Sequence, residues 1–129
     1  MSLVLVDTSI WIDFLKDDVS EETETLLNLL DEDKVCILPV IRAEILTGAR
    51  TERDFNELRE KLSALPCLDE PEDLWDDAAW TRFRLARRGI QTSLIDLMIA
   101  VTASRHHCPL LTRAREFRQI ARIIPLRFA

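Results

Sequence analysis

Three acidic residues stand alone within apolar segments of this chain. Asp7 directly follows a short apolar run, and Glu44 and Asp96 lie inside the apolar segments 40–46 and 93–101. Burying a lone carboxylate costs free energy unless it is paired or binds a metal. Three such placements in one small domain indicate a shared cation, and a hard cation held by carboxylates is typical of phosphate chemistry.

Each acid also has a purely structural interpretation. Asp7 can cap the helix that follows it by accepting backbone N–H bonds. Asp96 comes three residues after Ser93, which is the spacing of a capping box. Glu44 can be a surface acid on an amphipathic helix. Taken singly, these interpretations are the stronger ones; the three acids together favour a functional site.

The elements that must position these acids alternate along the chain. Apolar patterning predicts strands at residues 3–6, 35–38, 67–68, 110–111 and 123–126, with helices between them, including 51–65, 93–106 and 113–121. This order predicts a single domain over residues 1–129, a three-layer α/β/α fold with a mostly parallel sheet of about four to five strands. Asp7 and Thr112 directly follow strands, and Glu44 and Asp96 fall early in helices. We therefore expect these residues at the carboxyl edge of the sheet, where such folds bind ligands.

Composition describes an ordinary soluble globule, with 47% hydrophobic and 31% charged residues. No apolar run approaches the roughly 20 residues of a membrane span, and the N-terminus does not resemble a signal peptide. We therefore expect no membrane association and a cytoplasmic location.

Charge is unevenly distributed along a chain whose net charge is −6. Residues 13–34 hold nine acids against two lysines, whereas residues 105–127 hold six arginines against Glu116. Residues 82–88 add four arginines and no acid. This polarity fits a local phosphate-facing patch, and a set of solvated helix faces is the alternative.

Cysteine, histidine and tryptophan residues give weaker signals. The cysteines are Cys36, Cys67 and Cys108. They form no C-x-x-C pair, which disfavours zinc, and we expect Cys36 and Cys67 to be small buried hydrophobes. His106 and His107 follow Asp96 by about ten residues, roughly 15 Å of helix, too far to share its metal. The tryptophans, Trp11, Trp75 and Trp80, are expected in the core or at an interface, and with no aromatic cluster evident we expect no base stacking.

Four segments contain these acids in a fixed order. They are Val6-Asp7-Thr8-Ser9-Ile10-Trp11-Ile12-Asp13-Phe14-Leu15, Ala43-Glu44-Ile45-Leu46-x-Gly48, Leu94-Ile95-Asp96-Leu97-Met98-Ile99-Ala100 and Leu111-Thr112-Arg113-Ala114-Arg115-Glu116-Phe117. In order, spacing and chain length they resemble the motifs of the PIN-domain family, and specifically of its VapC-type toxins, over essentially the whole chain.

The resemblance implies a magnesium-dependent endoribonuclease that is the toxin of a toxin–antitoxin pair. Asp7 and Asp96 would ligate Mg²⁺ or Mn²⁺, and Glu44 would complete the acidic cluster directly or through water. A cation relieves the repulsion between clustered carboxylates, and a water on it can attack a phosphodiester. The implied partners are an RNA substrate, a cognate antitoxin and a second copy of the chain. Candidate dimer contacts are the helix 55–65 and Trp75 or Trp80.

One position departs from the family pattern. The fourth motif usually has an acid where this chain has Ala114, which can neither bind a metal nor orient water. Glu116, two residues on, can compensate through a longer reach. The alternative is a catalytically impaired PIN domain that acts as an antitoxin- or RNA-binding module. A phosphohydrolase with Asp7 as a covalent nucleophile is disfavoured, because Ser9 stands where that chemistry needs a second acid.

Supporting roles fall to residues beside the acids. The hydroxyls of Thr8, Ser9 and Thr112 can orient a carboxylate or a metal-bound water, or can cap helices. Arg113 and Arg115 are candidate phosphate contacts, or part of a solvated helix face. Asp13 is expected to be structural and to pair with an arginine.

Overall fold

The computed structural model describes residues 3–129 and contains a sheet of three parallel strands in the order β2–β1–β3. The strands are β1 (Val4–Val6), β2 (Val35–Cys36) and β3 (Leu110–Leu111). Leu5 of the central strand pairs with Cys36 on one side and Leu110 on the other. All the strand residues are buried, as is typical of parallel strands with both faces covered.

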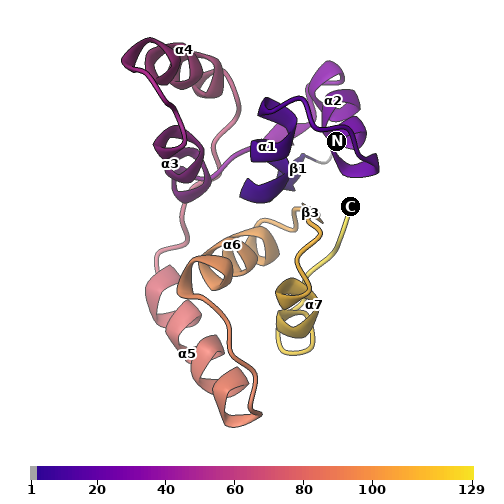
Figure 1. Cartoon of the computed structure of the whole chain (residues 1–129). Helices are drawn as coiled ribbons and strands as arrows, with labels where there is room; N and C mark the ends of the chain where they lie inside the picture. The colour runs from indigo at the N-terminus through magenta and orange to yellow at the C-terminus, as the bar shows by residue number, and fades with distance from the viewer. Residues whose placement is uncertain (1–2) are drawn as a thin grey trace.

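Helices occupy most of the rest of the described chain (Figure 1). They are α1 (Thr8–Leu15), α2 (Glu21–Asp31), α3 (Pro39–Thr47), α4 (Glu52–Ser63), α5 (Leu74–Arg87), α6 (Leu94–Arg105) and α7 (Glu116–Ile120). Their starts follow from the sequence, because the side chains of Ser20, Thr51 and Ser93 each accept a bond from a backbone N–H of the first turn. Pro39 opens α3, and Gly89 adopts φ +77° after α5.

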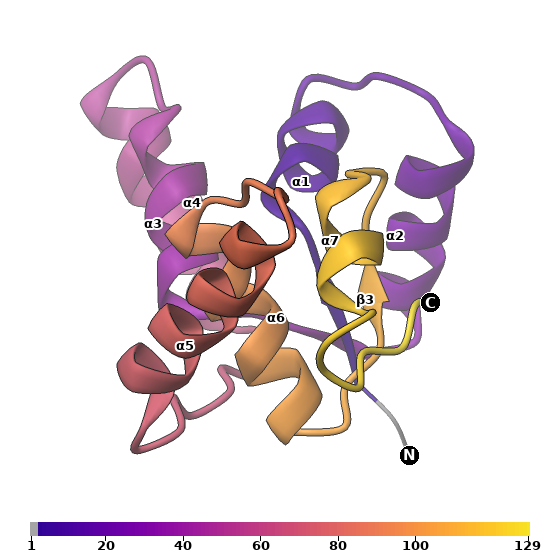
Figure 2. The ribbon, with the colours of Figure 1, turned by 90° about the horizontal axis from the view of Figure 1, so that it is seen from below.

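The helices cover both faces of the sheet. The chain passes from β1 to β2 through α1 and α2, and then returns past β1 to β3 through α3–α6. Right-handed crossovers in opposite directions place their helices on opposite faces, and Figure 2 shows α1 and α2 on one side of the strands and α3–α6 on the other. The connections after β1 and β2 therefore diverge, which opens a crevice at the carboxyl edge of the sheet.

The helix α6 is the most deeply buried, and the residues from Leu97 to Ala103 are all buried. The helix α5 packs on it through Leu74, Ala78, Thr81 and Leu85. This packing fixes the amino end of α6 against the domain and leaves the opposite side of α5 exposed.

The predicted fold class is confirmed, but the sheet has fewer strands than predicted. Residue 67 makes only an isolated parallel bridge to Ile37, and residues 123–126 form no strand, with Phe128 making an isolated bridge to Leu110. Proline explains both differences, because Pro66 and Pro125 provide no N–H for a ladder at these places.

Two smaller predictions were also wrong. The helix expected over residues 113–121 begins only at Glu116, because the N–H of Ala114 donates to the hydroxyl of Thr112 in a local turn. Cys67 is exposed rather than buried, whereas Cys36 and Cys108 are buried with their Sγ atoms 3.4 Å apart. Within residues 3–129, no helix is both long enough and apolar enough to cross a membrane.

Candidate active site

Asp7 is held by donors from two strand ends. Asp7 is the N-cap of α1 and is only 7% exposed. Oδ1 accepts the backbone N–H of Thr8 at 2.8 Å, and Oδ2 accepts the hydroxyls of Thr112 at 2.9 Å and Ser9 at 3.3 Å. Because Thr112 directly follows β3, these bonds join the carboxyl ends of β1 and β3 and fix the orientation of the carboxylate.

Glu44 is joined to the same site through Thr8. The hydroxyl of buried Thr8 donates to Oε1 of Glu44 at 2.8 Å, while its backbone N–H serves Asp7. Glu44 is half-buried on α3, 36 residues along the chain from Thr8. One threonine therefore orients two carboxylates from different elements. Its hydroxyl orients a carboxylate, as one of the two predicted roles had it, whereas the cap of α1 is the side chain of Asp7.

Asp96 lies in the first turn of α6, where the hydroxyl of Ser93 accepts its backbone N–H at 3.0 Å. Burial raises the pKa of the Asp96 carboxyl, and so does the negative charge of Asp7, with further contributions from Glu116 and Glu44; a hydrogen bond from Ser93 acts in the opposite direction. Three other carboxylates therefore repel the ionised form of Asp96. The structure brings together Asp7, Glu44 and Asp96 as the sequence predicted, and it places Glu116, the predicted supporting acid, within electrostatic reach of Asp96.

The chemistry of these donors fits a hard divalent cation. All are carboxylate or hydroxyl oxygens, which Mg²⁺ and Mn²⁺ prefer. Of the ion pairs found within residues 3–129, none neutralises Asp7, Glu44 or Asp96. The same residues contain no set of three ligand side chains close enough to enclose an ion directly.

The fourth predicted motif lies beside this cluster. Glu116 is exposed at the first position of α7 and still acts on the pKa of Asp96. Ala114 is half-buried, and its N–H donates to the Thr112 hydroxyl, which in turn donates to Asp7. Position 114, where the family usually has an acid, therefore lies at the edge of the hydrogen-bond network, and Glu116 is an acid near enough to act on Asp96.

The two candidate phosphate contacts differ in their surroundings. Arg113 forms an ion pair with Asp13, and its Nε lies 3.7 Å from Oε1 of Glu22. This pairing confirms the structural role predicted for Asp13 and leaves the charge of Arg113 already compensated. Arg115 is exposed and enters none of the ion pairs found in the described part of the chain. Of the two, Arg115 is the more available cation.

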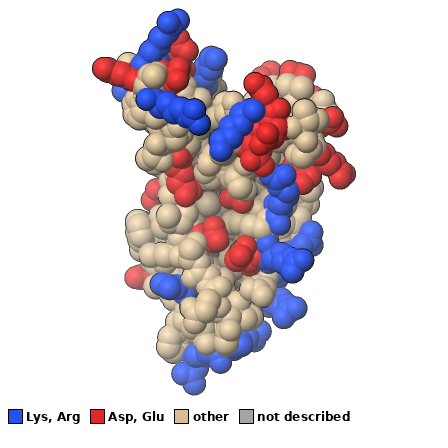
Figure 3. Space-filling view, in the orientation of Figure 1, with Lys and Arg blue, Asp and Glu red and all other residues tan. Residues whose placement is uncertain are grey.

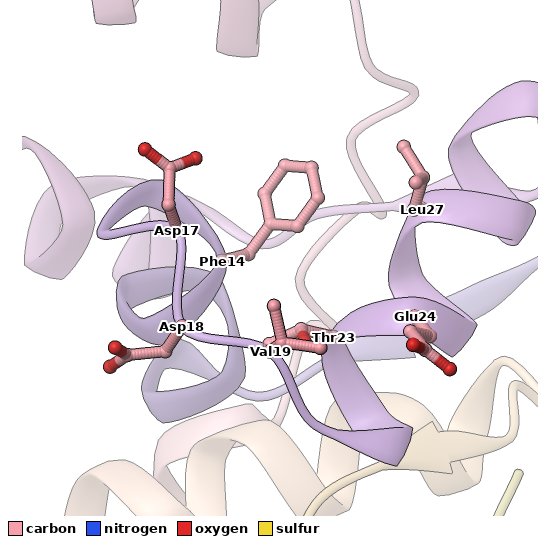
Figure 4. A pocket seen from close by; sticks show the side chains of 7 residues that line it. All are labelled: Phe14, Asp17, Asp18, Val19, Thr23, Glu24 and Leu27. Carbon is pink, nitrogen blue, oxygen red and sulfur yellow. The ribbon is translucent and has the colours of Figure 1, made fainter.

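A groove elsewhere on the molecule is not part of this site. It has a volume of about 370 Å³ and lies between α1 and α2, with Phe14, Val19 and Leu27 among its apolar lining residues and with Asp17, Asp18 and Glu24 around them (Figure 4). None of its lining residues belongs to the acidic cluster.

Sequence analysis missed an exposed aromatic cluster. Trp11 is in the core as expected, but Trp80 and Phe83 are 58% and 51% exposed and stack on each other. The expectation that no aromatic cluster is available for base stacking was therefore wrong. The signal was present in the three-residue spacing of Trp80 and Phe83, which places them on one helix face.

Comparison with known proteins identifies the family of this chain. The PIN domain family model matches residues 4–123. Ribonuclease VapC11 of Mycobacterium tuberculosis is 31% identical over 131 residues, covering 98% of each chain. The DNA-bound VapBC structure from Salmonella typhimurium is 26% identical, with a TM-score of 0.76 over 100% of this chain and 98% of that one. VapBC-1 from nontypeable Haemophilus influenzae shares the fold, with a TM-score of 0.77 at 21% identity over 98% and 96% of the two chains. Because the PIN domain family model and these relatives match almost the whole chain, the chain belongs to the PIN-domain family and, within it, to the VapC proteins.

Proposed function

We propose that this protein is an endoribonuclease that uses Mg²⁺ or Mn²⁺ to hydrolyse RNA phosphodiester bonds, and that it is the toxin of a toxin–antitoxin pair. The observation that carries the proposal is the acidic cluster at the carboxyl edge of the sheet, where hydrogen bonds through Thr8 and Thr112 hold Asp7 and Glu44 and where Asp96 lies close enough for burial and the charge of Asp7 to raise its pKa. The 31% identity to a VapC ribonuclease supports the reaction, and the likeness to VapBC toxin–antitoxin structures supports the pairing.

Each acid has a distinct part in this proposal. Asp7 and Asp96 would hold the cation, which when bound supplies an activated water and stabilises the charge that develops on the phosphate. Three donors lock Asp7 in one orientation, so it meets its ligand preorganised. Glu44 keeps Oε1 occupied by Thr8 and turns its remaining acceptor capacity to water at the site.

An impaired binding module remains the second candidate, and Ala114 is the observation that favours it. A domain without the usual fourth acid could keep its antitoxin and RNA contacts and lose hydrolysis. Glu116 weighs against this alternative, because it lies two residues from Ala114 and its negative charge still acts on Asp96.

The assembly is part of the proposal. We infer that the 129 residues form one domain that acts in the cytoplasm as a homodimer with a cognate antitoxin. Phe55 on α4 and Trp75 on α5, 37% and 59% exposed, are the candidate contacts between copies. Sedimentation at tens of micromolar should give a dimer mass, and a monomer would contradict this part of the proposal.

The reaction itself is tested with a labelled single-stranded RNA pool. We expect cleavage with Mg²⁺ or Mn²⁺, none with EDTA, and none from Asp96→Asn. Asp31→Asn, which removes a surface acid at the end of α2, is the matched control and should cleave like the parent. If the Asp96→Asn protein cleaves as fast as the parent, the proposed site is wrong.

A further inference from the structure

The outer side of α5 presents two stacked aromatic rings to solvent. The ring centroids of Trp80 and Phe83 lie 5.6 Å apart with an interplanar angle of 20°. The guanidinium carbon of Arg87 lies 5.6 Å from the centroid of the Phe83 ring. Exposed apolar side chains that are grouped together and rimmed by polar residues are typical of an interaction site.

The same helix end is strongly basic. Arg82, Arg84, Arg87 and Arg88 are all exposed, and the chain has no acid between Asp77 and Asp96. None of the four arginines enters an ion pair found in residues 3–129. In Figure 3, basic side chains gather at the lower edge, the end of the molecule at which α5 ends in Figure 1. This surface is a local exception in a chain of net charge −6.

Helix geometry places the rings and two arginines on one face. Trp80, Phe83, Arg84 and Arg87 follow the i, i+3, i+4, i+7 spacing of a single face. Buried Thr81 and Leu85 belong to the opposite face, which packs on α6. The face thus remains available while α5 is fully docked.

This face lies at the end of α5 that leads to the acidic cluster. Only the short segment 88–93 separates α5 from α6, and Asp96 is in the first turn of α6. The two helices pack side by side (Figure 1). The carboxyl end of α5 lies at the lower end of the molecule in Figure 1, and the segment 88–93 runs back from it to the start of α6. A single strand bound on α5 would therefore reach the cluster by extending along the side of this segment.

We propose that the α5 face formed by Trp80, Phe83, Arg84 and Arg87 binds single-stranded RNA and guides it to the acidic cluster. Unpaired bases stack on the two rings, and the arginines contact the phosphates on either side. Stacked aromatics beside a basic track are the combination that binds single strands without sequence preference. The inference rests on the proposed function for its substrate class.

Self-association is the competing use of this face. A twofold dimer would place the same patch on both sides of the interface. The arginines of one copy would then meet those of the other, with no acid from residues 78–95 to separate them. The positive charge of this face therefore favours a polyanion over a second copy. We accordingly place Trp80 in the RNA-binding face and keep Trp75 as the candidate dimer contact.

The test is fluorescence anisotropy of a labelled single-stranded RNA oligonucleotide, titrated with the full chain in EDTA so that hydrolysis is blocked. Trp80→Ala should weaken binding by roughly five- to a hundredfold, as loss of a stacked base does. The matched control is Leu27→Ala, which truncates another large apolar side chain that is about half exposed, on α2, and which should bind like the parent. Phe83→Ala repeats the test should Trp80→Ala fold poorly. Duplex RNA should show no dependence on Trp80, because its bases are already stacked.

The arginines are tested by salt dependence. Arg84→Ala and Arg87→Ala should each weaken binding and reduce the slope of log K against log salt by about 0.7, the value for one phosphate contact on a single strand. The control is Arg53→Ala, which removes an exposed arginine on α4 that pairs with Glu57 and should leave the slope unchanged.

Several outcomes would overturn the inference. Equal RNA affinity in the Trp80→Ala and Leu27→Ala proteins would do so, as would an undetectable affinity of the parent for single strands. Loss of the dimer in Trp80→Ala with RNA affinity unchanged would assign the face to self-association. Failure of the proposed function is separate: a parent that binds RNA through Trp80 but never cleaves it would keep the binding face and remove the enzyme.

Discussion

The acidic edge of the sheet and the outer face of α5 are built in opposite ways. At the edge, the carboxylates of Asp7 after β1, Glu44 on α3 and Asp96 on α6 are partly or fully buried. Hydrogen bonds through Thr8 and Thr112 join Asp7 to Glu44 and to the end of β3. On α5 the side chains proposed to bind RNA come from one helix and are exposed, and Phe83 stacks on Trp80 and lies under Arg87. The first region is made rigid by bonds between distant segments, and the second by the helix alone.

The difference matches two kinds of ligand. A small cation requires oxygens fixed in three dimensions, which only the convergence of several elements can provide. A flexible strand of RNA requires a row of rings and charges, which one helix face can provide. The comparison predicts that changes at the edge act on the chemical step, whereas changes on α5 act on binding.

The largest effect is expected from Asp7→Asn. The change removes a proposed metal ligand with little change in shape, so we expect RNA cleavage to fall by at least a hundredfold. Affinity for single-stranded RNA in EDTA should stay the same or increase, because a negative charge is removed. Cleavage and anisotropy measured on one preparation check both. If Asp7→Asn lowers affinity as much as Trp80→Ala does, the two regions are not separate in function.

A second test asks whether the acidic edge is complete. Ala114→Asp adds a carboxylate beside Thr112, favours cation binding and should raise cleavage, by up to about a hundredfold where the absent acid limits the rate. Asp96→Asn in that background should abolish the gain, because the added acid acts only through the cation.

Glu116→Gln in the parent separates the two remaining explanations if Ala114→Asp brings no gain. A tenfold or greater loss of cleavage would indicate that Glu116 already compensates for Ala114. A parent with no cleavage to lose would indicate a binding module. Neither Ala114→Asp nor Glu116→Gln should change the affinity for single-stranded RNA by as much as the α5 variants do.

Sequence reasoning was most successful where local chemistry decides structure. The helix starts at Asp7 and Ser93 were recognisable because a cap acts within one turn. The gathering of Asp7, Glu44 and Asp96 was also predictable, because parallel strands share a carboxyl edge. Their proposed roles in catalysis and metal binding still await experiment.

The rest depended on partners that are distant in sequence. Nothing local indicates that Arg113 pairs with Asp13, 100 residues away, or that one Thr8 serves two acids. The strands expected at 67–68 and 123–126 failed because short apolar runs next to proline cannot sustain a ladder. Trp80 and Phe83 were undervalued because their exposure depends on which face of α5 meets α6.

A moderate effect is expected from Thr112→Val. The change keeps the shape and removes the hydroxyl that donates to Asp7 and accepts from Ala114. Leaving a buried carboxylate oxygen short of a donor should cost about 1–3 kcal/mol of unfolding free energy, and the loosened Asp7 should cleave RNA more slowly. Urea denaturation measures the first effect. Ser104→Ala, at a site on α6 away from the cluster, is the control, and equal losses in both proteins would argue against a special role for Thr112.

The smallest effect is expected on the melting point, because the repulsion among the acidic side chains lowers the stability of the fold. Folding raises the pKa of Asp96 above its ordinary value near 3.8, so the folded protein holds that proton more tightly than the unfolded chain. The associated stabilisation is fully present below that ordinary value and is lost as pH rises through the folded pKa. At neutral pH the ionised carboxylate therefore opposes folding, and Asp96→Asn should melt a few degrees higher than the parent in EDTA, with the gap closing toward pH 4.

Saturating Mg²⁺ should reverse the order of the two melting points, because a cation that binds only the native parent raises its melting point. No such reversal is expected for Trp80→Ala, whose melting point should respond to Mg²⁺ as the parent's does. An Asp96→Asn protein that is less stable than the parent in EDTA at pH 7 would show that Asp96 is a structural cap and not a member of a repelling cluster.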